Sequence, residues 1–417
     1  MRPFPPGNRA PRPPAWLAAL AAAGVAARLG VLLLGPRRGL IAPFPVDVAE
    51  HFSGAEIERA RAYRRPQLRL AAARSVMEGA LLLALVRRPP APLIRLGPHR
   101  VLNGARAGAL LSGGLTAATL PLAVLSRRRG LAAGLLTQSW EGWATDVAKS
   151  AGIGAGLAGT GAAGTLELVR RWPRQWWLPG SALLVGVSAI SLVAGPTVID
   201  PLFNRFTALA AGPLRDDVLE LASRAGVDVG EVYTVDASRR TTAANAYVTG
   251  LGPTKRVVLY DTLIDGFTRQ ETRSVVAHEL AHVRHRDVSA GVAYLALIAP
   301  ASLHGVARLT ERLSATRPSE ATPTPALLPA LAVSVGVVAA IVGSISSALS
   351  RRIEARADAF ALRLTDEPEP FVSFERRISL LNLSDPDPPA WQTALLASHP
   401  PTAARIGIAQ AYAAGVR

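Results

Sequence analysis

Residues 275 to 287 decide the fold, and they read Val275-Val-Ala-His278-Glu279-Leu-Ala-His282-Val-Arg-His285-Arg-Asp287. This stretch contains an H-E-x-x-H pattern. On a helix His278 and His282 share a face, so both can bind one metal ion. Glu279 then lies beside the ion, placed to take a proton from a bound water. Thr268 can cap the helix, and no Gly or Pro interrupts it. The alternative is two histidines on a solvated helix face, but histidine is scarce here, with 7 in the chain.

The composition is typical of a membrane protein. Hydrophobic residues make up 49% of the chain and aromatic residues only 5%, and the apolar residues form long Ala/Leu/Val/Gly blocks. The chain has no Cys, which excludes disulfides, thiolate metal ligands and a cysteine nucleophile. Any metal must therefore be held by His and carboxylates, a ligand set that suits catalytic better than structural zinc.

The net charge of +16 comes almost wholly from arginine. The arginines cluster beside the apolar blocks, at Arg37-Arg38, Arg87-Arg88, Arg127-Arg128-Arg129 and Arg170-Arg171. This placement indicates a lipid bilayer with anionic lipid as the partner. Basic and aromatic residues do not interleave as they do in nucleic-acid-binding proteins, so no nucleic-acid partner is expected.

About seven apolar blocks are close to the ~20 residues that cross a bilayer. They cover residues 14–35, 69–87, 103–126, 147–169, 176–197, 288–309 and 326–349. The second and fourth contain ionisable groups, among them Arg74, Glu78 and Glu167, which should face a protein interior or a water-filled cavity. The first block resembles a signal peptide, but its length and the lack of a clean cleavage site favour an uncleaved span.

The fourth block also contains Gly154-Ala-Gly156-Leu-Ala-Gly159, which matches the dinucleotide-binding pattern G-x-G-x-x-G. No strand pattern precedes it, and its surroundings are apolar and helical. Small residues that let membrane helices pack closely explain it better than a nucleotide site does.

These features divide the chain into five regions. Residues 1–13 should be disordered, 14–199 form a membrane region with about five spans, and 288–349 form two further spans. Residues 200–287 form a polar catalytic region that ends with the H-E-x-x-H helix. Its expected elements are a helix at 215–225, a strand at 231–235, and paired strands at 245–250 and 256–260. Residues 350–417 form a mainly helical C-terminal region.

A catalytic zinc site needs a third protein ligand. Glu354 and Asp358 follow the last apolar block and lie four apart, so on a helix both carboxylates face the same way. One can bind the metal while the other accepts the free ring N–H of a ligand histidine. The alternative is a solvated helix face on which these carboxylates form surface ion pairs.

Together, HELAH and the distant Glu354-Ala-Arg-Ala-Asp358 resemble the CAAX prenyl protease family of zinc metallopeptidases, in particular its type 1, multi-spanning branch. Three further stretches agree: Pro201-Leu-Phe-Asn-Arg-Phe-Thr-Ala-Leu, Asn245-Ala-Tyr-Val-Thr-Gly-Leu-Gly, and Ser398-His399-Pro400-Pro401 with Arg405. The resemblance implies a mainly α, integral membrane fold, in which about seven helices enclose a chamber. It also implies a zincin-like catalytic region built from the H-E-x-x-H helix and a small sheet with an edge strand.

The resemblance implies roles by position. His278, His282 and Glu354 would bind one Zn²⁺ per chain, Glu279 would be the base, and Asp358 would support a ligand histidine. Asn245 and Ala246 would lie on the edge strand that pairs with the substrate backbone, and His399 and Arg405 would line the site opposite the metal. His285 is expected on the helix surface, because the third-histidine pattern of other zinc proteases needs a longer spacing with Gly. His304 has no assigned role.

The expected function is a membrane-embedded zinc endopeptidase acting on membrane-associated or lipidated proteins. One alternative is a quality-control protease for membrane proteins. A non-enzymatic alternative is a membrane scaffold with an inactive protease fold, against which the intact Glu279 and Glu354 argue. The preference for Arg over Lys and the Ala/Gly/Pro richness suggest a multi-pass protein of a bacterial cell membrane. Membrane orientation, oligomeric state and physiological substrate stay open.

Overall fold

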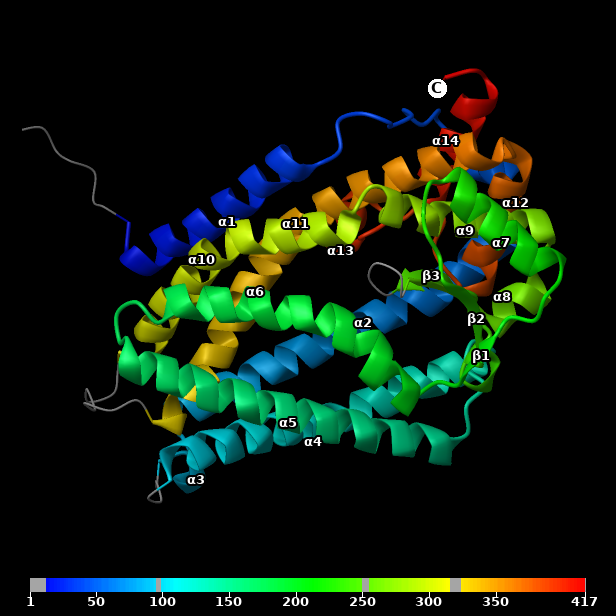
Figure 1. Ribbon diagram of the computed structural model, residues 1–417. Helices are drawn as coiled ribbons and strands as arrows, with labels where there is room; N and C mark the ends of the chain where they lie inside the picture. Colours follow the sequence, from blue (N-terminus) through cyan, green and yellow to red (C-terminus); the bar gives the residue numbers. More distant parts are fainter. Residues whose placement is uncertain (1–12, 95–98, 250–254, 316–323, 417) are drawn as a thin grey trace, which may run out of the picture.

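The computed structural model in Figure 1 describes residues 13–94, 99–249, 255–315 and 324–416. Long helices run side by side through most of the molecule, and a small sheet with several shorter helices gathers at one end. The long helices are α1 (Ala15–Leu34), α2 (Gly54–Arg87), α4 (Arg100–Ala132), α5 (Trp140–Arg171), α6 (Trp177–Ala194), α10 (Asp287–Ser314) and α11 (Leu328–Thr365). Each of the seven predicted spans falls on one of them. The predicted disorder of residues 1–13 lies, except for residue 13, outside the described residues.

Length and apolarity alone qualify four helices of the described chain as membrane spans, namely α1, α4, α10 and α11. Helix α6 makes a fifth if it is counted with the segment Gly195–Leu202, from which it is bent by 46°. Helices α2 and α5 are 34 and 32 residues long, which is long enough to cross a bilayer, but neither is apolar enough to count as a clear membrane span. The structure thus confirms a mainly α membrane fold, with four to five clear candidate spans.

Helix α2 is longer than its apolar block because the more polar residues 54–68 form its N-terminal half. Ser53 and Glu56 form a capping box at its start, and Pro66 is tolerated inside it. Within the helix Arg74 Nε donates to Glu78 Oε1 at 2.8 Å, so the charges of these two ionisable groups offset each other.

Helices α4 and α5 pack closely through small residues, as the sequence predicts for the glycine-rich block. A Cβ at Gly108 would lie 2.5 Å from the backbone oxygen of Ala158, and one at Gly159 would lie 2.8 Å from that of Ala105. The glycines therefore permit backbone contact between two membrane helices.

The sheet has the order β1-β2-β4-β3, formed by β1 (Phe206–Ala208), β2 (Glu231–Val235), β4 (Arg256–Tyr260) and β3 (Ala246–Thr249). Strands β2 and β4 are parallel, and the other two pairs are antiparallel. The predicted strand at 231–235 and the predicted pairing of β3 with β4 are confirmed. Strand β1 was not predicted. Strand β3 lies at an edge, with β4 on one side only.

Five short helices share a core with the sheet: α7 (Pro213–Arg224), α8 (Asp261–Gly266), α9 (Arg269–Arg284), α12 (Pro368–Leu381) and α14 (Thr402–Ala413). A sixth, α13 (Ala390–Leu396), packs against α11. The four-residue α3 (Ala91–Ile94) lies apart from them, beside α4. The core of this end contains Leu221, Leu259, Leu280, Leu362 and Ile408, each at most 2% exposed. Because Leu280 belongs to α9 and Leu362 to α11, this core holds the end of the long helix against the H-E-x-x-H helix.

Candidate active site

Helix α9 begins with the cap that the sequence predicts. Thr268 N donates to Glu271 Oε2 at 2.7 Å, and Glu271 N donates to Thr268 Oγ1 at 3.3 Å. This capping box fixes the start of the helix, and with it the rotation that points His278 and His282 toward α11.

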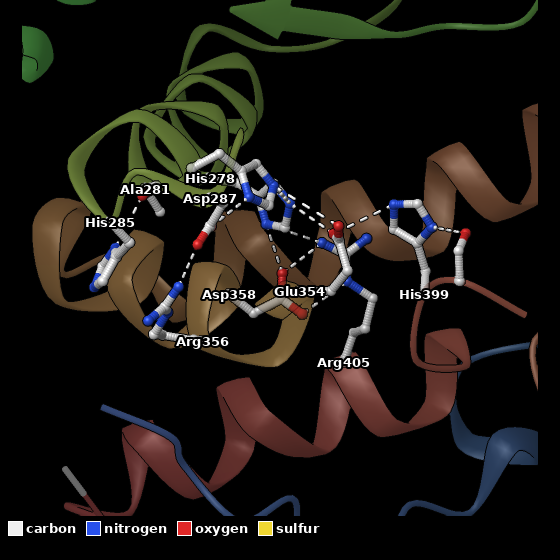
Figure 2. A network of polar contacts seen from close by, with 11 residues as sticks. His278, Ala281, His285, Asp287, Glu354, Arg356, Asp358, His399 and Arg405 are labelled. Carbon is white, nitrogen blue, oxygen red and sulfur yellow. Dashed lines mark hydrogen bonds and ion pairs between the residues drawn. The ribbon is translucent and has the colours of Figure 1, made fainter. Parts of the chain in front are cut away.

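The three predicted metal ligands converge, as Figure 2 shows for His278 and Glu354. His278 Nε2 lies 3.1 Å from Glu354 Oε2, and His282 Nε2 lies 3.3 Å from His278 Nε2. His282 Nε2 is also 3.8 Å from Glu354 Oε1. Tetrahedral zinc with ligand bonds of about 2.0–2.2 Å separates neighbouring ligand atoms by roughly 3.3–3.6 Å. The spacing of these three donors therefore fits a zinc ion.

Each histidine has its other ring nitrogen on a carboxylate. His278 Nδ1 lies 2.8 Å from Asp358 Oδ1, and His282 Nδ1 lies 3.0 Å from Asp287 Oδ2. Donation from Nδ1–H to a carboxylate leaves the Nε2 lone pair free for a metal. Two imidazoles whose Nε2 atoms face one point, with a carboxylate beside them, form a donor set suited to zinc.

Asp287 is a site residue that the sequence reasoning missed. It starts α10, directly after Arg286, whose backbone is left-handed with φ of 58°. That turn brings Asp287 back beside His282, and Arg356 binds its other carboxylate oxygen. The only signal in the sequence was an Asp five residues after the second histidine.

The charge at this place favours a cation. Burial lowers the pKa of His278, but hydrogen bonds to Asp358 and Glu354 outweigh burial and raise this pKa to about 10. The same carboxylates that stabilise a proton on His278 would stabilise a metal ion bound at Nε2.

Glu279 points into the same place. One carboxylate oxygen and a ring nitrogen of each histidine lie within 4.8 Å of one another. Burial in the cavity raises the pKa of Glu279, and the nearby histidines oppose this effect. A carboxyl group of raised pKa beside a metal is suited to accept and return a proton.

A cavity of about 500 Å³ opens beside His278 and Glu279, and residues of β3, α12 and α14 complete its wall. Asn245 and Ala246 line it, as do His399 and Arg405, so one cavity unites these predicted site residues. Asn245 precedes the edge strand β3, and an extended peptide can add to such an edge through backbone hydrogen bonds.

His399 and Arg405 approach the ligand cluster from the C-terminal segment (Figure 2). His399 Nε2 lies 3.3 Å from Glu354 Oε2, and its Nδ1 lies 2.9 Å from Ser398 Oγ. Helix α14 begins at Thr402, directly after Pro400 and Pro401, and carries Arg405.

Arg405 binds two buried acids. Its Nε lies 2.9 Å from Asp358 Oδ2, and its Nη1 lies 2.7 Å from Glu375 Oε1. Burial raises the pKa of Glu375 to about 7, and the charge of Arg405 opposes this rise. Glu375, which the sequence reasoning also missed, is thus coupled through Arg405 to the carboxylate that holds His278.

His285 and His304 lie away from the ligands. His285 caps α9, with Nδ1 2.9 Å from Ala281 O, and Figure 2 shows it apart from the cluster. His304 packs edge-on against Trp177, with ring centroids 4.9 Å apart. His285 is therefore no ligand in this arrangement, as predicted.

Comparison with known proteins agrees with this geometry. A model of peptidase family M48 matches residues 208–413, and a model of the CAAX prenyl protease N-terminal region, described as five membrane helices, matches residues 132–205. An uncharacterized metalloprotease of Bacillus subtilis, YhfN, is 32% identical over 295 residues, which cover 70% of this chain and 69% of the relative.

CAAX prenyl protease 1 of Saccharomyces cerevisiae is 34% identical over 143 residues, 34% of this chain and 31% of the yeast protein. The crystal structure of S. mikatae Ste24p superposes with a TM-score of 0.77 at 22% identity, covering 96% of this chain and 100% of that one. Ste24p thus shares the fold. From the family matches, the converging donors and the membrane helices, this chain belongs to peptidase family M48 and is an integral membrane metalloendopeptidase.

Proposed function

We propose that this protein is a zinc-dependent endopeptidase that hydrolyses peptide bonds in membrane-associated or lipidated proteins of a bacterial cell membrane. The observation that carries the proposal is the convergence of His278, His282 and Glu354 beside Glu279, in a cavity bordered by a sheet edge. Similarity to a Bacillus subtilis relative supports the bacterial setting, and similarity to CAAX prenyl protease 1 supports a lipidated substrate.

His278 and His282 would hold one zinc ion through their Nε2 atoms, and Glu354 through its carboxylate. Zinc bound there supplies Lewis-acid chemistry: it makes water acidic near neutral pH and polarises a peptide carbonyl. Asp358 and Asp287 keep both imidazoles in the tautomer that can bind metal.

Glu279 takes the proton from the attacking water and returns it to the amine that leaves. Its raised pKa suits both halves of this cycle. The substrate backbone lies along β3 near Asn245 and Ala246, so that its scissile carbonyl faces Glu279 across the cavity.

His399 donates a hydrogen bond to the carbonyl oxygen as this atom gains negative charge. When the Ser398 hydroxyl donates to Nδ1, the His399 proton sits on Nε2, the nitrogen that faces Glu354. Arg405 adds positive potential from α14, and its ion pair with Asp358 fixes the support of His278.

The Glu279→Gln variant tests this function. Purified wild-type protein should contain one zinc per chain by atomic emission and cleave peptides. Glu279→Gln should keep its zinc and lose about 10²–10⁴-fold in turnover, because the water loses its base. Glu354→Ala serves as the matched variant that should lose the zinc itself.

Two results would contradict the proposal. Near wild-type turnover in Glu279→Gln would require a different base. A wild-type protein that contained no stoichiometric zinc and had no peptidase activity would favour the alternative of a non-enzymatic membrane scaffold.

A further inference from the structure

A second cavity of about 1000 Å³ lies beside the catalytic cavity, and it is lined by arginines. Five line its wall: Arg61, Arg64, Arg65, Arg69 and Arg351. Four of them belong to α2, where spacings of three residues (61 to 64) and four residues (61 to 65 and 65 to 69) place them along one side of the helix. The segment from Asp385 to Ala394 forms the opposite wall.

Two of these arginines are already engaged. Arg61 Nε lies 3.1 Å from Asp385 Oδ2. Arg351 Nη1 donates to the backbone oxygens of Thr393 at 2.8 Å and Ala397 at 2.7 Å. These contacts hold the segment that forms the opposite wall in place, and they leave the cavity itself open.

The other three arginines are free. Arg64, Arg65 and Arg69 are exposed, and within the described ranges they form no ion pair or side-chain hydrogen bond. The one further carboxylate on the wall is that of Asp387, so positive charge predominates. Guanidinium groups on a shared wall bind carboxylates well, because each presents a planar set of N–H donors.

The arginine-lined cavity adjoins the catalytic one. Six residues line both: Arg64, Leu68, Asp385, Pro388, Gln392 and Pro401. The arginine-lined cavity therefore lies within one wall of a peptide held at His278 and Glu279, with Leu68 and Arg64 between the two. An anion bound there would belong to the same substrate chain.

From this geometry we infer that the arginine-lined cavity is a subsite that binds a carboxylate of the peptide substrate. The inference rests on the proposed peptidase function and specifies which peptides it prefers. The carboxylate can be the C-terminus of the substrate or an acidic side chain near the cleavage site. Both present the same charged, planar group to Arg64, Arg65 and Arg69.

One peptide in three forms tests the inference on full-length protein in phosphatidylcholine nanodiscs. The forms are an internally quenched peptide with a free C-terminal carboxylate, its C-terminal amide, and the amide with one Glu added near that end. Wild type should cleave the free acid with a kcat/KM about ten- to thirtyfold above the amide, the size expected for charge-assisted hydrogen bonds in a partly exposed site. A similar gain for the Glu-containing amide would identify a side chain as a second source of the carboxylate.

The triple variant Arg64→Gln/Arg65→Gln/Arg69→Gln should reduce the ratio between acid and amide to about one. Arg59→Gln is the matched control, because Arg59 is exposed on the same helix and does not line the cavity. This control should keep the wild-type ratio. Equal cleavage of acid and amide by wild type, or an unchanged ratio in the triple variant, would overturn the inference.

Binding separates this inference from the proposed chemistry. Fluorescence anisotropy with Glu279→Gln measures the same acid preference without turnover, so a preference in binding with no cleavage by wild type would contradict the peptidase function alone. Nanodiscs that contain phosphatidylglycerol test the competing occupant, a lipid headgroup. If that lipid changes cleavage of all three peptides equally, and only when the three arginines are present, the cavity binds lipid and the inference is wrong.

Discussion

At the scale of single residues, the site is organised by carboxylates that lie behind the ligands. Asp358 is fully buried and Asp287 nearly so, and each receives both a histidine Nδ1 and an arginine. The arginines, Arg405 and Arg356, offset the charge of the carboxylates. Each imidazole is therefore held in one orientation by a pair of opposite charges.

Asp358→Asn and Asp287→Asn should each weaken zinc binding by about 10–100-fold, because an amide holds the imidazole less firmly than a carboxylate does. Competition with a fluorescent chelator measures the affinity. Asp358→Asn should also lower Tm more than Asp287→Asn does, since it leaves the mostly buried Arg405 with Glu375 as its one acidic partner among the described residues. Unchanged zinc affinity in both variants would show that Asp358 and Asp287 only form structural ion pairs and do not support the metal ligands.

His399→Ala should keep zinc and fold, bind substrate with little change, and lose about 10²–10³-fold in kcat, the usual cost of removing one oxyanion donor. Single-turnover kinetics at saturating substrate measure this loss. Ser398→Ala should lower kcat by a smaller factor. In this variant the imidazole of His399 remains, but the serine hydroxyl no longer holds its proton on Nε2. If His399→Ala lost zinc, His399 would be a ligand. If kcat stayed unchanged, the residue would have no part in the chemistry.

Spacing rules predicted the residues that are related along one helix. Four-residue intervals placed His278 with His282 and Glu354 with Asp358, and all four side chains meet in the structure. The missed residues make contacts that no interval along the sequence encodes. Asp287 returns to the site through a left-handed residue, and Glu375 reaches it from another helix through Arg405.

At the scale of elements, α11 joins the membrane region to the chemistry. Its 38 residues run from an apolar span into the catalytic end, and Glu354, on its C-terminal part, lies against α9. The sequence predicted both parts of this helix. It also predicted the pairing of β3 with β4, because a short polar connection limits strand pairing to neighbours. The parallel pairing of β2 with β4 was not predictable, since alternation in a strand does not specify a non-adjacent partner.

Asp217 on α7 should make stability depend on pH in the acid range. Its hydrogen bonds to Arg269 and Arg273, which lie on α9, outweigh burial and lower the pKa of its carboxyl. A pKa lowered by folding gives stability that is present above the unfolded value of about 3.9 and is lost as pH falls through the folded value. Asp217→Asn should therefore lower Tm near neutral pH by removing about 1–3 kcal/mol.

Thermal unfolding of wild type and Asp217→Asn from pH 7 to pH 2.5 measures this effect. The difference in Tm should shrink below about pH 4, where the Asp217 carboxylate of the unfolded chain begins to take up a proton, and should vanish as pH falls through the lowered pKa of the folded state. Asp216→Asn is the control, because among the described residues this neighbouring aspartate forms no ion pair with α9, whereas Asp217 pairs with Arg269 and Arg273. A Tm difference that stayed constant down to pH 2.5 would show that the ion pairs of Asp217 do not carry the stability.

At the scale of the whole molecule, the segment between α1 and α2 meets the C-terminal helix α14 at the catalytic end. The segment after α1 passes along α14 (Figure 1), where Phe44 N donates to Gly407 O at 3.1 Å. A Cβ at Gly407 would lie 2.3 Å from Phe44 O, so only glycine allows this approach. Ile41, on the same segment, belongs to the core of the catalytic end. Composition and block lengths predicted the membrane class, but not this long-range contact.

Removal of zinc should lower the stability of the whole protein without unfolding it. The proposed ligands lie on two elements, α9 and α11, so an ion that binds them in the folded state alone stabilises that state by mass action, by about 4 kcal/mol at a thousandfold excess over its Kd. Buried apolar residues such as Val276, Leu280 and Leu362 still pack the same two helices together.

Chelation of zinc by 1,10-phenanthroline should therefore lower Tm by several degrees, and added zinc should restore it. Tryptophan fluorescence measures the thermal unfolding. Glu354→Ala should start at the lower Tm and respond to neither treatment. If wild-type Tm stayed the same after atomic emission had shown the zinc to be gone, the metal would not link these helices, and the assignment of Glu354 as a ligand would be wrong.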